Sequence, residues 1–231
     1  MKKKKYLKRA GIISVALILI CVIGFFAYVS NYYHAQDYQV GNITITEEKN
    51  YIVYGDSNSK TGFIFYPGGK VEAEAYKPIL SKLAEKGICC VLVEMPYNLA
   101  VFDSNAADDI MQDFKKIENW YIGGHSLGGA MASSFAAEHQ EDLKGLVLLA
   151  AYPTDKLEIP VLSIYGSEDG VLNREKYGDS IDLAENLTEI VIKGGNHAQF
   201  GNYGEQSGDG KAAISKEEQW NQTVKQILNF I

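Results

Sequence analysis

One ten-residue stretch, residues 120–129, constrains the fold of this chain more than any other. It reads Trp-Tyr-Ile-Gly-Gly-His-Ser-Leu-Gly-Gly, so a short apolar run leads into a Gly-x-Ser-x-Gly sequence centred on Ser126. A run of small residues, 130–137, follows and is typical of a helix. A strand, a sharp turn and a helix with serine at the apex form a nucleophile elbow, in which Gly124 and Gly128 let strand and helix approach closely. The stretch therefore predicts a serine held in a strained backbone conformation.

Strands and helices alternate along the rest of the chain. Two β-type runs, 43–46 and 51–54, predict an antiparallel hairpin. After the hairpin, apolar runs typical of buried strands are separated by segments with helical spacing. Strands are predicted over 62–66, 88–93, 145–151, 160–165 and 187–192, and helices over 71–86, 103–117, 173–183 and 215–231. This alternation favours an α/β fold with a mostly parallel sheet covered by helices on both faces.

The N-terminus differs in composition from everything that follows. Residues 1–9 are basic, whereas residues 10–29 contain no charged residue and are long enough to span a bilayer core of roughly 30 Å. The apolar run is longer than that of a cleaved signal peptide, which is the alternative, and it lacks a good cleavage site. We therefore expect a transmembrane signal anchor over 10–30, a stalk over 31–41 and an extracytoplasmic domain over 42–231, with the basic flank in the cytoplasm.

Charge and cysteine content exclude several classes of function. Six of the 22 basic residues lie in the flank, which leaves 16 basic against 29 acidic residues and argues against nucleic acid as a partner. The three cysteines, Cys21, Cys89 and Cys90, lie in apolar runs and predict small buried residues instead of a disulfide framework. The segment 208–210, Gly-Asp-Gly, is too sparse for a calcium loop. We expect neither a metal nor an organic cofactor.

A serine nucleophile needs a base, and the base needs an acid that orients it. In a parallel sheet, such groups follow the carboxyl ends of strands, and after an elbow they come in the order serine, acid, histidine. Asp169 follows the strand predicted over 160–165, and we prefer it to its neighbour Glu168 because it lies deeper in the loop beside Gly170. His197 follows the last predicted strand and is therefore the expected base.

The other three histidines fit the role of base less well. His34 lies in the predicted stalk, His125 lies inside the elbow, and His139 ends the helix after the elbow. A tetrahedral intermediate also needs two hydrogen-bond donors for its oxyanion. We expect the backbone N–H of Leu127 as the first donor. The second comes from the glycine-containing loop 67–70, with the Gly69 amide preferred and Lys70 as the alternative; a purely structural turn is the other interpretation of this loop.

The elbow, Tyr165–Asp169 and Gly195–His197 together resemble the α/β-hydrolase superfamily over about residues 43–231. Within it, the chain is similar to the small dienelactone-hydrolase-like proteins. The resemblance implies the α/β-hydrolase fold and a Ser126–Asp169–His197 triad. Dienelactone hydrolases proper carry a cysteine nucleophile, so the serine here favours an esterase-type activity. Larger members carry a lid before the strand of the acid, whereas residues 152–159 have room for a loop only.

These observations lead us to expect a membrane-anchored, extracytoplasmic serine hydrolase that cleaves a small carboxylic ester through an acyl-enzyme. Without a lid, we expect an open site and a preference for short acyl groups. Two alternatives remain. An acyltransferase or a peptidase would use the same triad, and a non-catalytic surface binding module would share the fold without the reaction.

Overall fold

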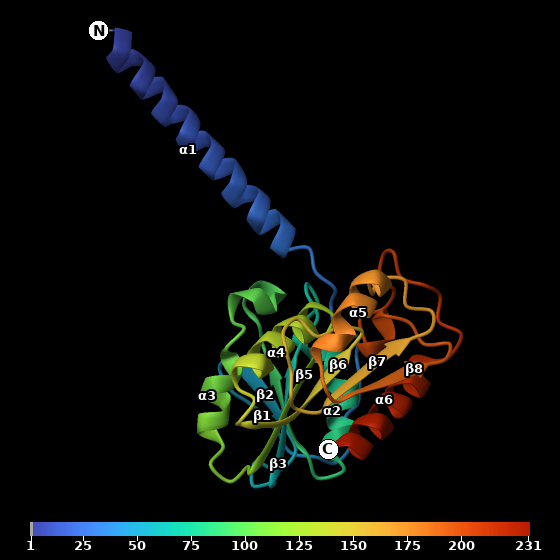
Figure 1. Cartoon of the computed structure of the whole chain (residues 1–231). Coiled ribbons are helices and arrows are strands. Elements are labelled where there is room, and N and C mark those ends of the chain that lie inside the picture. Colours follow the sequence, from blue (N-terminus) through green and yellow to red (C-terminus); the bar gives the residue numbers. More distant parts are fainter. Residues whose placement is uncertain (1) are drawn as a thin grey trace. The chain divides into compact units, whose positions relative to one another are not determined.

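The computed structural model describes residues 2–231 and divides into two compact units, residues 1–32 and 33–231. The first unit consists mainly of one helix, α1 (Lys2–Val29), drawn in blue in Figure 1. Within the described residues, no helix has both the length and the apolar character that crossing a membrane requires. The transmembrane anchor expected over 10–30 is therefore not confirmed. The side chains of the expected basic flank, 1–9, lie outside the described part.

The second unit is built on one eight-stranded sheet with the strand order β1-β2-β4-β3-β5-β6-β7-β8. The first two strands form the predicted antiparallel hairpin, β2 pairs antiparallel with β4, and all other neighbours are parallel, which confirms the predicted topology. The strands are β1 (Ile45–Glu47), β2 (Tyr51–Tyr54), β3 (Thr61–Tyr66), β4 (Cys89–Val93), β5 (Asn119–His125), β6 (Leu143–Leu149), β7 (Val161–Gly166) and β8 (Leu187–Ile192).

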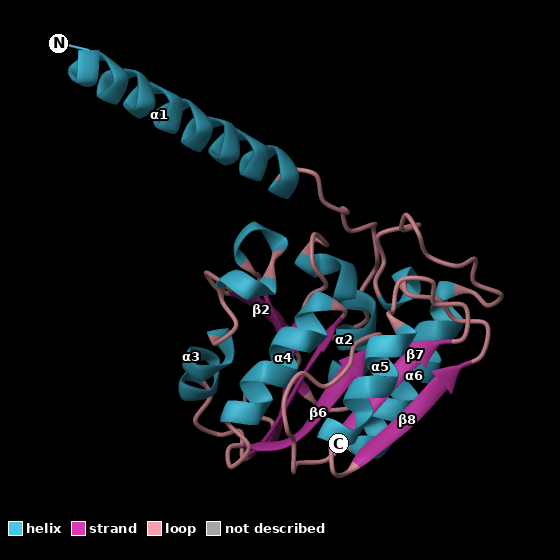
Figure 2. Cartoon of the chain, turned by 45° about the horizontal axis from the view of Figure 1, so that its top comes forward, coloured by secondary structure: helices cyan, strands magenta, loops and turns pink. Residues whose placement is uncertain are grey.

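Helices cover both faces of the sheet, as Figure 2 shows. On one face α2 (Lys77–Ala84) and α6 (Lys216–Phe230) pack on a core that contains Phe63 and Phe65 of β3. On the other face α3 (Ala106–Asp113), α4 (Leu127–Glu138) and α5 (Arg174–Ser180) lie over a core that contains Ile64 and Tyr66. Successive residues of β3 thus enter opposite cores, because side chains alternate along a strand.

Both cores include a cysteine of β4. Cys89 and Cys90 are fully buried, one on each face of the sheet, and all three cysteines of the chain are free. Burial raises the pKa of the Cys89 thiol to about 11 and raises the pKa of the Cys90 thiol well above its usual value. The prediction of small buried side chains is confirmed for Cys89 and Cys90, whereas Cys21 in α1 is exposed, so the prediction is wrong for that residue.

Two predicted helices are shorter than their sequence patterns indicate. The segment predicted as a helix over 71–86 begins with a 3₁₀ turn at Ala73–Tyr76 and becomes α-helical only at Lys77, with Pro78 in the first turn. The segment predicted over 103–117 is helical only over α3, because the backbone of Phe114 leaves the helical region. Beyond Phe114 the chain turns to enter β5.

The segment predicted as a stalk packs on the second unit from Tyr33 onward. Tyr33 N–H donates to the Lys70 carbonyl at 2.8 Å, and the Tyr33 carbonyl accepts the Glu72 N–H at 2.9 Å. Gln36 exchanges hydrogen bonds with Asn202: its N–H donates to the Asn202 carbonyl at 2.7 Å, and its carbonyl accepts from the Asn202 side chain at 2.9 Å. Residues 33–38, which we call the docked segment, are therefore part of the folded domain.

The connection between β6 and β7 is short. Residues 150–160, all of which the structure describes, form a loop without a helix. One isolated bridge between Leu157 and Ala184 joins this loop to the segment that precedes β8. This connection therefore carries no inserted helical lid.

Candidate active site

Ser126 lies at the apex of a tight turn between β5 and α4. Its backbone has φ 52° and ψ −120°, a conformation that costs free energy for a residue with a side chain. The Ser126 N–H donates to the Leu149 carbonyl at 2.9 Å, which fixes the turn against β6. A methyl group on Gly128 would collide with the carbonyl oxygens of Pro67 and Tyr66. Gly128 therefore lets the first turn of α4 lie directly on the end of β3.

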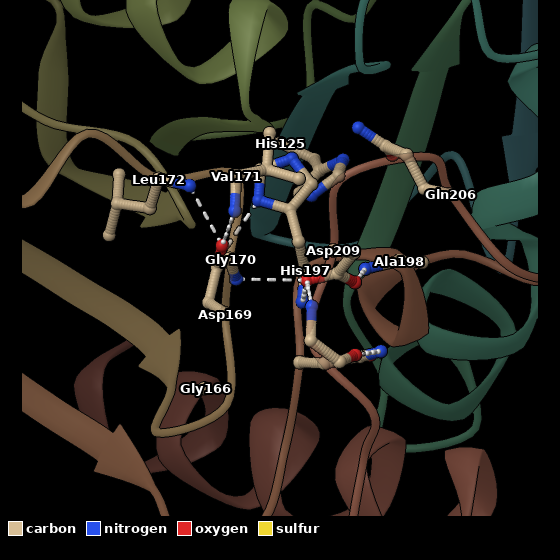
Figure 3. Close-up of polar contacts among 12 residues, drawn as sticks. His125, Gly166, Asp169, Gly170, Val171, Leu172, His197, Ala198, Gln206 and Asp209 are labelled. Atoms are coloured by element: carbon tan, nitrogen blue, oxygen red, sulfur yellow. Dashed lines mark hydrogen bonds and ion pairs between the residues drawn. The ribbon is translucent and has the colours of Figure 1, made fainter.

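Asp169 and His197 form a buried pair at the ends of β7 and β8. Asp169 Oδ2 lies 2.9 Å from His197 Nδ1, and the two side chains are 0% and 2% exposed (Figure 3). The other oxygen of Asp169 accepts the N–H groups of Val171 at 2.9 Å and Leu172 at 2.8 Å. Burial raises the pKa of the Asp169 carboxyl, but the hydrogen bond and charge of His197 and these two amides outweigh it and hold the pKa below its usual value.

This arrangement sets the tautomer of His197. An ionised Asp169 is an acceptor only, so His197 Nδ1 carries the proton and donates it to Asp169. His197 Nε2 then holds the free lone pair, and among the described residues it has no hydrogen-bond partner. Ser126, Leu127 and His197 line one cavity of about 260 Å³. The three predicted residues Ser126, Asp169 and His197 are therefore brought to the same edge of the sheet.

The alternative acid and bases lie elsewhere. Glu168 is exposed and accepts a hydrogen bond from the Ser167 hydroxyl at 2.8 Å. His139 ends α4, the far end from Ser126, and its Nε2 lies 3.1 Å from an Asp108 oxygen. His34 is largely exposed, near Glu72.

His125 is buried directly beside the base. Its ring centroid is 4.4 Å from that of His197, and its Nδ1 lies 2.7 Å from the hydroxyl of Tyr76. Burial and the neighbouring His197 hold the pKa of His125 well below its usual value, so His125 is neutral at pH 7. His125 therefore contributes packing against the His197 ring and a hydrogen bond with Tyr76.

The backbone N–H groups of the loop after β3 differ in whether they have a hydrogen-bond partner. The Gly68 N–H donates to the Tyr76 hydroxyl at 3.0 Å, and the Lys70 N–H donates to the Asn98 carbonyl at 2.7 Å. Within the described residues, no hydrogen bond engages the Gly69 N–H. A methyl group on Gly69 would lie 2.7 Å from a side-chain carbon of Leu127, so loop and elbow are in contact. The Leu127 N–H opens α4 and therefore has no partner one turn earlier in the helix.

Sequence reasoning missed two residues of this region, Asp209 and Tyr76. Asp209 accepts hydrogen bonds from four backbone N–H groups, among them that of His197. Tyr76 joins the loop after β3 to His125. Tyr76 lies in no motif, and the Gly-Asp-Gly segment around Asp209 suggests only a calcium loop, for which it is too sparse. Their partners are backbone amides and a buried ring, so no spacing in the sequence reveals these roles. Among the described residues no group of three or more histidine, cysteine, aspartate or glutamate side chains is placed to hold a metal.

Comparison with known proteins agrees with this architecture. The sequence model of the alpha/beta hydrolase family matches residues 62–221, whereas no curated protein matches the chain. Est1E from Butyrivibrio proteoclasticus with bound ferulic acid superposes with a TM-score of 0.63 at 14% identity, covering 83% of this chain and 97% of that chain.

Two further structures share the fold at similarly low identity. MGS-MChE2, an alpha/beta hydrolase enzyme from the metagenome of sediments of the Mar Chica lagoon in Morocco, has a TM-score of 0.61 at 17% identity and covers 80% and 98% of the two chains. A laboratory-evolved variant of the potato epoxide hydrolase StEH1 has a TM-score of 0.58 at 11% identity and covers 82% and 99%. Because the family match spans more than half of the sequence, the chain belongs to the alpha/beta hydrolase family.

Proposed function

We propose that this protein is a serine hydrolase that cleaves a carboxylic ester through an acyl-enzyme. The observation that carries the proposal is the buried pair of Asp169 and His197, 2.9 Å apart, together with the cavity that His197 and the strained Ser126 both line. Backbone strain costs free energy and persists where the surrounding structure enforces it, which is typical of functional sites. The bound ferulic acid of Est1E agrees with the proposal, since a carboxylic acid is the product that ester cleavage releases.

The first half-reaction transfers the acyl group to the enzyme. His197 Nε2 takes the proton of the Ser126 hydroxyl as Oγ bonds to the ester carbonyl carbon, and the carbonyl electron pair moves onto oxygen. The Leu127 and Gly69 N–H groups donate to this oxyanion. Collapse of the intermediate breaks the bond to the alcohol oxygen, which receives the proton from His197. Asp169 stabilises the imidazolium that forms between the two proton transfers.

The second half-reaction uses water in place of the alcohol. His197 takes a proton from water as the water oxygen bonds to the acyl carbon, and the proton then returns to Ser126 as the acid leaves. No metal or organic cofactor takes part in these steps. An amine or alcohol acceptor in place of water would make the enzyme an acyltransferase, and an amide substrate would make it a peptidase. A surface binding module without turnover is the non-enzymatic alternative.

The cavity beside Ser126 supports a small acyl group as the substrate. Its volume is about 260 Å³, and most of its lining is apolar: Ala130, Ala150, Ala151, Tyr152, Val171 and Leu172. The loop 150–160 contributes Ala150, Ala151 and Tyr152 to this lining and contains no helix that would form a lid. The expected partner is therefore a small-molecule ester, not nucleic acid.

The location of the enzyme is a separate part of the proposal and rests on sequence. The basic residues 1–9 followed by the uncharged residues 10–29 support a single-pass anchor with the hydrolase domain outside the cytoplasm. The test is to fractionate cells, extract membranes with alkaline carbonate, and add protease to intact protoplasts. Release of the protein by carbonate, or digestion of the domain only after lysis, would contradict this location.

The reaction is tested by labelling with a fluorophosphonate and by turnover of p-nitrophenyl butyrate. We expect Ser126→Ala to lose labelling and to lower kcat by several orders of magnitude, because the members of a triad act as a unit. His197→Ala should do the same, whereas the exposed Ser57→Ala should match the wild type. Product analysis with added alcohol or amine separates hydrolysis from acyl transfer. Labelling that persists in Ser126→Ala would disprove the assignment.

A further inference from the structure

Asp209 joins the loop of the acid to the loop of the base. One oxygen, Oδ1, accepts the N–H of Gly170 at 3.1 Å and the N–H of His197 at 3.2 Å. The other oxygen accepts the N–H of Ala198 at 2.8 Å, and Oδ1 also accepts the N–H of the following Gly210 at 2.8 Å. Figure 3 shows the carboxylate at the backbone of His197, with a dashed line to the backbone beside Asp169.

The two loops need such a connection because they come from different strands. Asp169 follows β7 and His197 follows β8, so their 2.9 Å contact depends on how the two loop tips are placed. Near the strands, the loops are tied by the Glu168 N–H to the Gly195 carbonyl at 2.8 Å. At the loop tips, the Asp209 carboxylate accepts the backbone N–H of Gly170, which follows the acid, and the backbone N–H of His197.

The segment 208–210 and the loop that carries Asp169 are also in close van der Waals contact. A methyl group on Gly170 would lie 2.7 Å from the Gly208 carbonyl oxygen, and one on Gly210 would collide with the Glu168 carbonyl. The segment 208–210 therefore lies directly against the loop of the acid. A displacement of this segment would move the tip that carries Asp169.

The four donors suit a carboxylate better than an amide. Two acceptor oxygens receive four N–H groups, and a carboxylate offers acceptors at both positions. In an Asp209→Asn variant one oxygen becomes an NH₂ group, which can only donate. Either the Ala198 N–H or the set of three N–H groups at Oδ1 then faces another donor, and the connection between the loops weakens.

We propose that Asp209 is a positioning residue that holds the Asp169 loop and the backbone of His197 in register, so that the Asp169–His197 hydrogen bond is preformed. This inference rests on the proposed function, in which that hydrogen bond orients the base. Asp209 itself touches no reacting atom. Its effect reaches the reaction through the position of His197, and a misplacement of about 1 Å costs about 10²-fold in rate.

The experiment compares Asp209→Asn and Asp209→Ala with Glu205→Gln, an exposed acidic residue of the same loop. The first measurement is the low-field proton resonance of His197 Nδ1–H in the resting protein. The second is kcat and KM for p-nitrophenyl butyrate, with circular dichroism to confirm folding. We expect both Asp209 variants to shift or broaden the resonance and to lower kcat about 10- to 100-fold with KM nearly unchanged. Glu205→Gln should match the wild type.

Two results would overturn the proposal. The first is a folded Asp209→Asn variant with an unchanged resonance and unchanged kcat. The second is failure of both variants to fold, which would make Asp209 a residue for the stability of the whole domain. The resonance is read without substrate, so it tests Asp209 even if the ester assignment is wrong. That assignment fails separately, when the wild type neither turns over esters nor reacts with a fluorophosphonate.

Discussion

The hydroxyl of Tyr76 lies 2.7 Å from Nδ1 of His125 and at the same time accepts the N–H of Gly68 at 3.0 Å. Because the hydroxyl oxygen accepts from Gly68, its proton is available for the lone pair of the neutral His125 ring. The His125 ring in turn packs against His197. One buried side chain thus connects the loop proposed to bind the oxyanion with the proposed base.

Replacing Tyr76 with Phe should lower kcat by more than the accompanying loss of stability explains. The change leaves two buried polar groups, the Gly68 N–H and His125 Nδ1, without a partner, at a cost of roughly 1–3 kcal/mol each. Tyr66→Phe is a matched control, since the buried Tyr66 hydroxyl also accepts one backbone N–H and donates to one carbonyl. Chemical denaturation should show a similar loss of stability for both, whereas kcat should fall mainly in Tyr76→Phe. Equal kcat values in the two variants would contradict this role.

Substitution with alanine should lower the stability of the domain at Gly128 and raise it at Gly178. In Gly128→Ala the new methyl group meets backbone carbonyl oxygens, which cannot move aside without shifting β3 or α4. We expect a loss of several kcal/mol, or no folded protein. Gly178 lies within α5 with open space around it, so Gly178→Ala should raise stability by up to about 1 kcal/mol. Thermal unfolding of both variants checks this, and a stable Gly128→Ala would mean that the elbow is less tightly packed than the structure shows.

The order of strands and helices could be predicted from the sequence because each element has a local residue pattern. The continuous apolar run at Cys89–Val93 is visible in the printed residues, and Gly124 and Gly128 mark the elbow. The alternation of such runs with helical segments then gives the parallel sheet. Asp169 and His197 could be predicted for the same reason, since each directly follows a strand.

The remaining features depend on contacts between distant segments. Asp209 binds amides of residues 170, 197 and 198, and no local pattern reports such partners. The docked segment is similar: its polar appearance suggests a stalk, but Tyr33 and Tyr38 pack on the core and Gln36 pairs with Asn202. The choice between the Gly69 and Lys70 amides likewise depends on the Asn98 carbonyl, which the sequence does not place.

Lowering the pH should reduce the free energy of unfolding of the domain, partly because Asp169 becomes protonated. Its folded pKa is below the unfolded value of roughly 3.9, so between the two values the unfolded chain binds more protons. The stability that Asp169 contributes is therefore complete above that unfolded value and is lost as the pH falls through the folded pKa. Urea unfolding at pH 6 to 3 should show a shallower acid loss in Asp169→Asn than in the wild type. The exposed Asp155→Asn is the control, and parallel curves for wild type and Asp169→Asn would refute the lowered pKa.

Removing the docked segment should destabilise the domain and its active-site loops. A chain beginning at residue 39 loses the bonds of Tyr33 and Gln36 to residues 70, 72 and 202, each worth roughly 0.5–1.5 kcal/mol net. It also loses the packing of Tyr38 on Trp220. A chain beginning at residue 33 keeps all of these contacts and is the matched control. Urea unfolding should give a lower free energy for the shorter chain, and equal values would mean that the segment only rests on the surface.

Acyl-chain selectivity should follow the small cavity beside Ser126. Each methylene that becomes fully buried gains about 0.8 kcal/mol, so kcat/KM rises with chain length only while the cavity of about 260 Å³ still has room. We expect p-nitrophenyl acetate to butyrate to be preferred to octanoate and palmitate. There should be no rise in rate above the critical micelle concentration, because the loop 150–160 contains no helix that could form a lid over a long chain.

The cavity wall gives a direct check of this preference. Ala130→Leu narrows the cavity and should lower kcat/KM for butyrate more than for acetate. Ser134→Leu is the control, since residue 134 lies one turn further along α4 and outside the lining of the cavity. A steady climb of kcat/KM toward palmitate in the wild type would show that another surface binds the acyl chain. Equal losses for acetate and butyrate in Ala130→Leu would show that this cavity holds the alcohol part of the substrate instead.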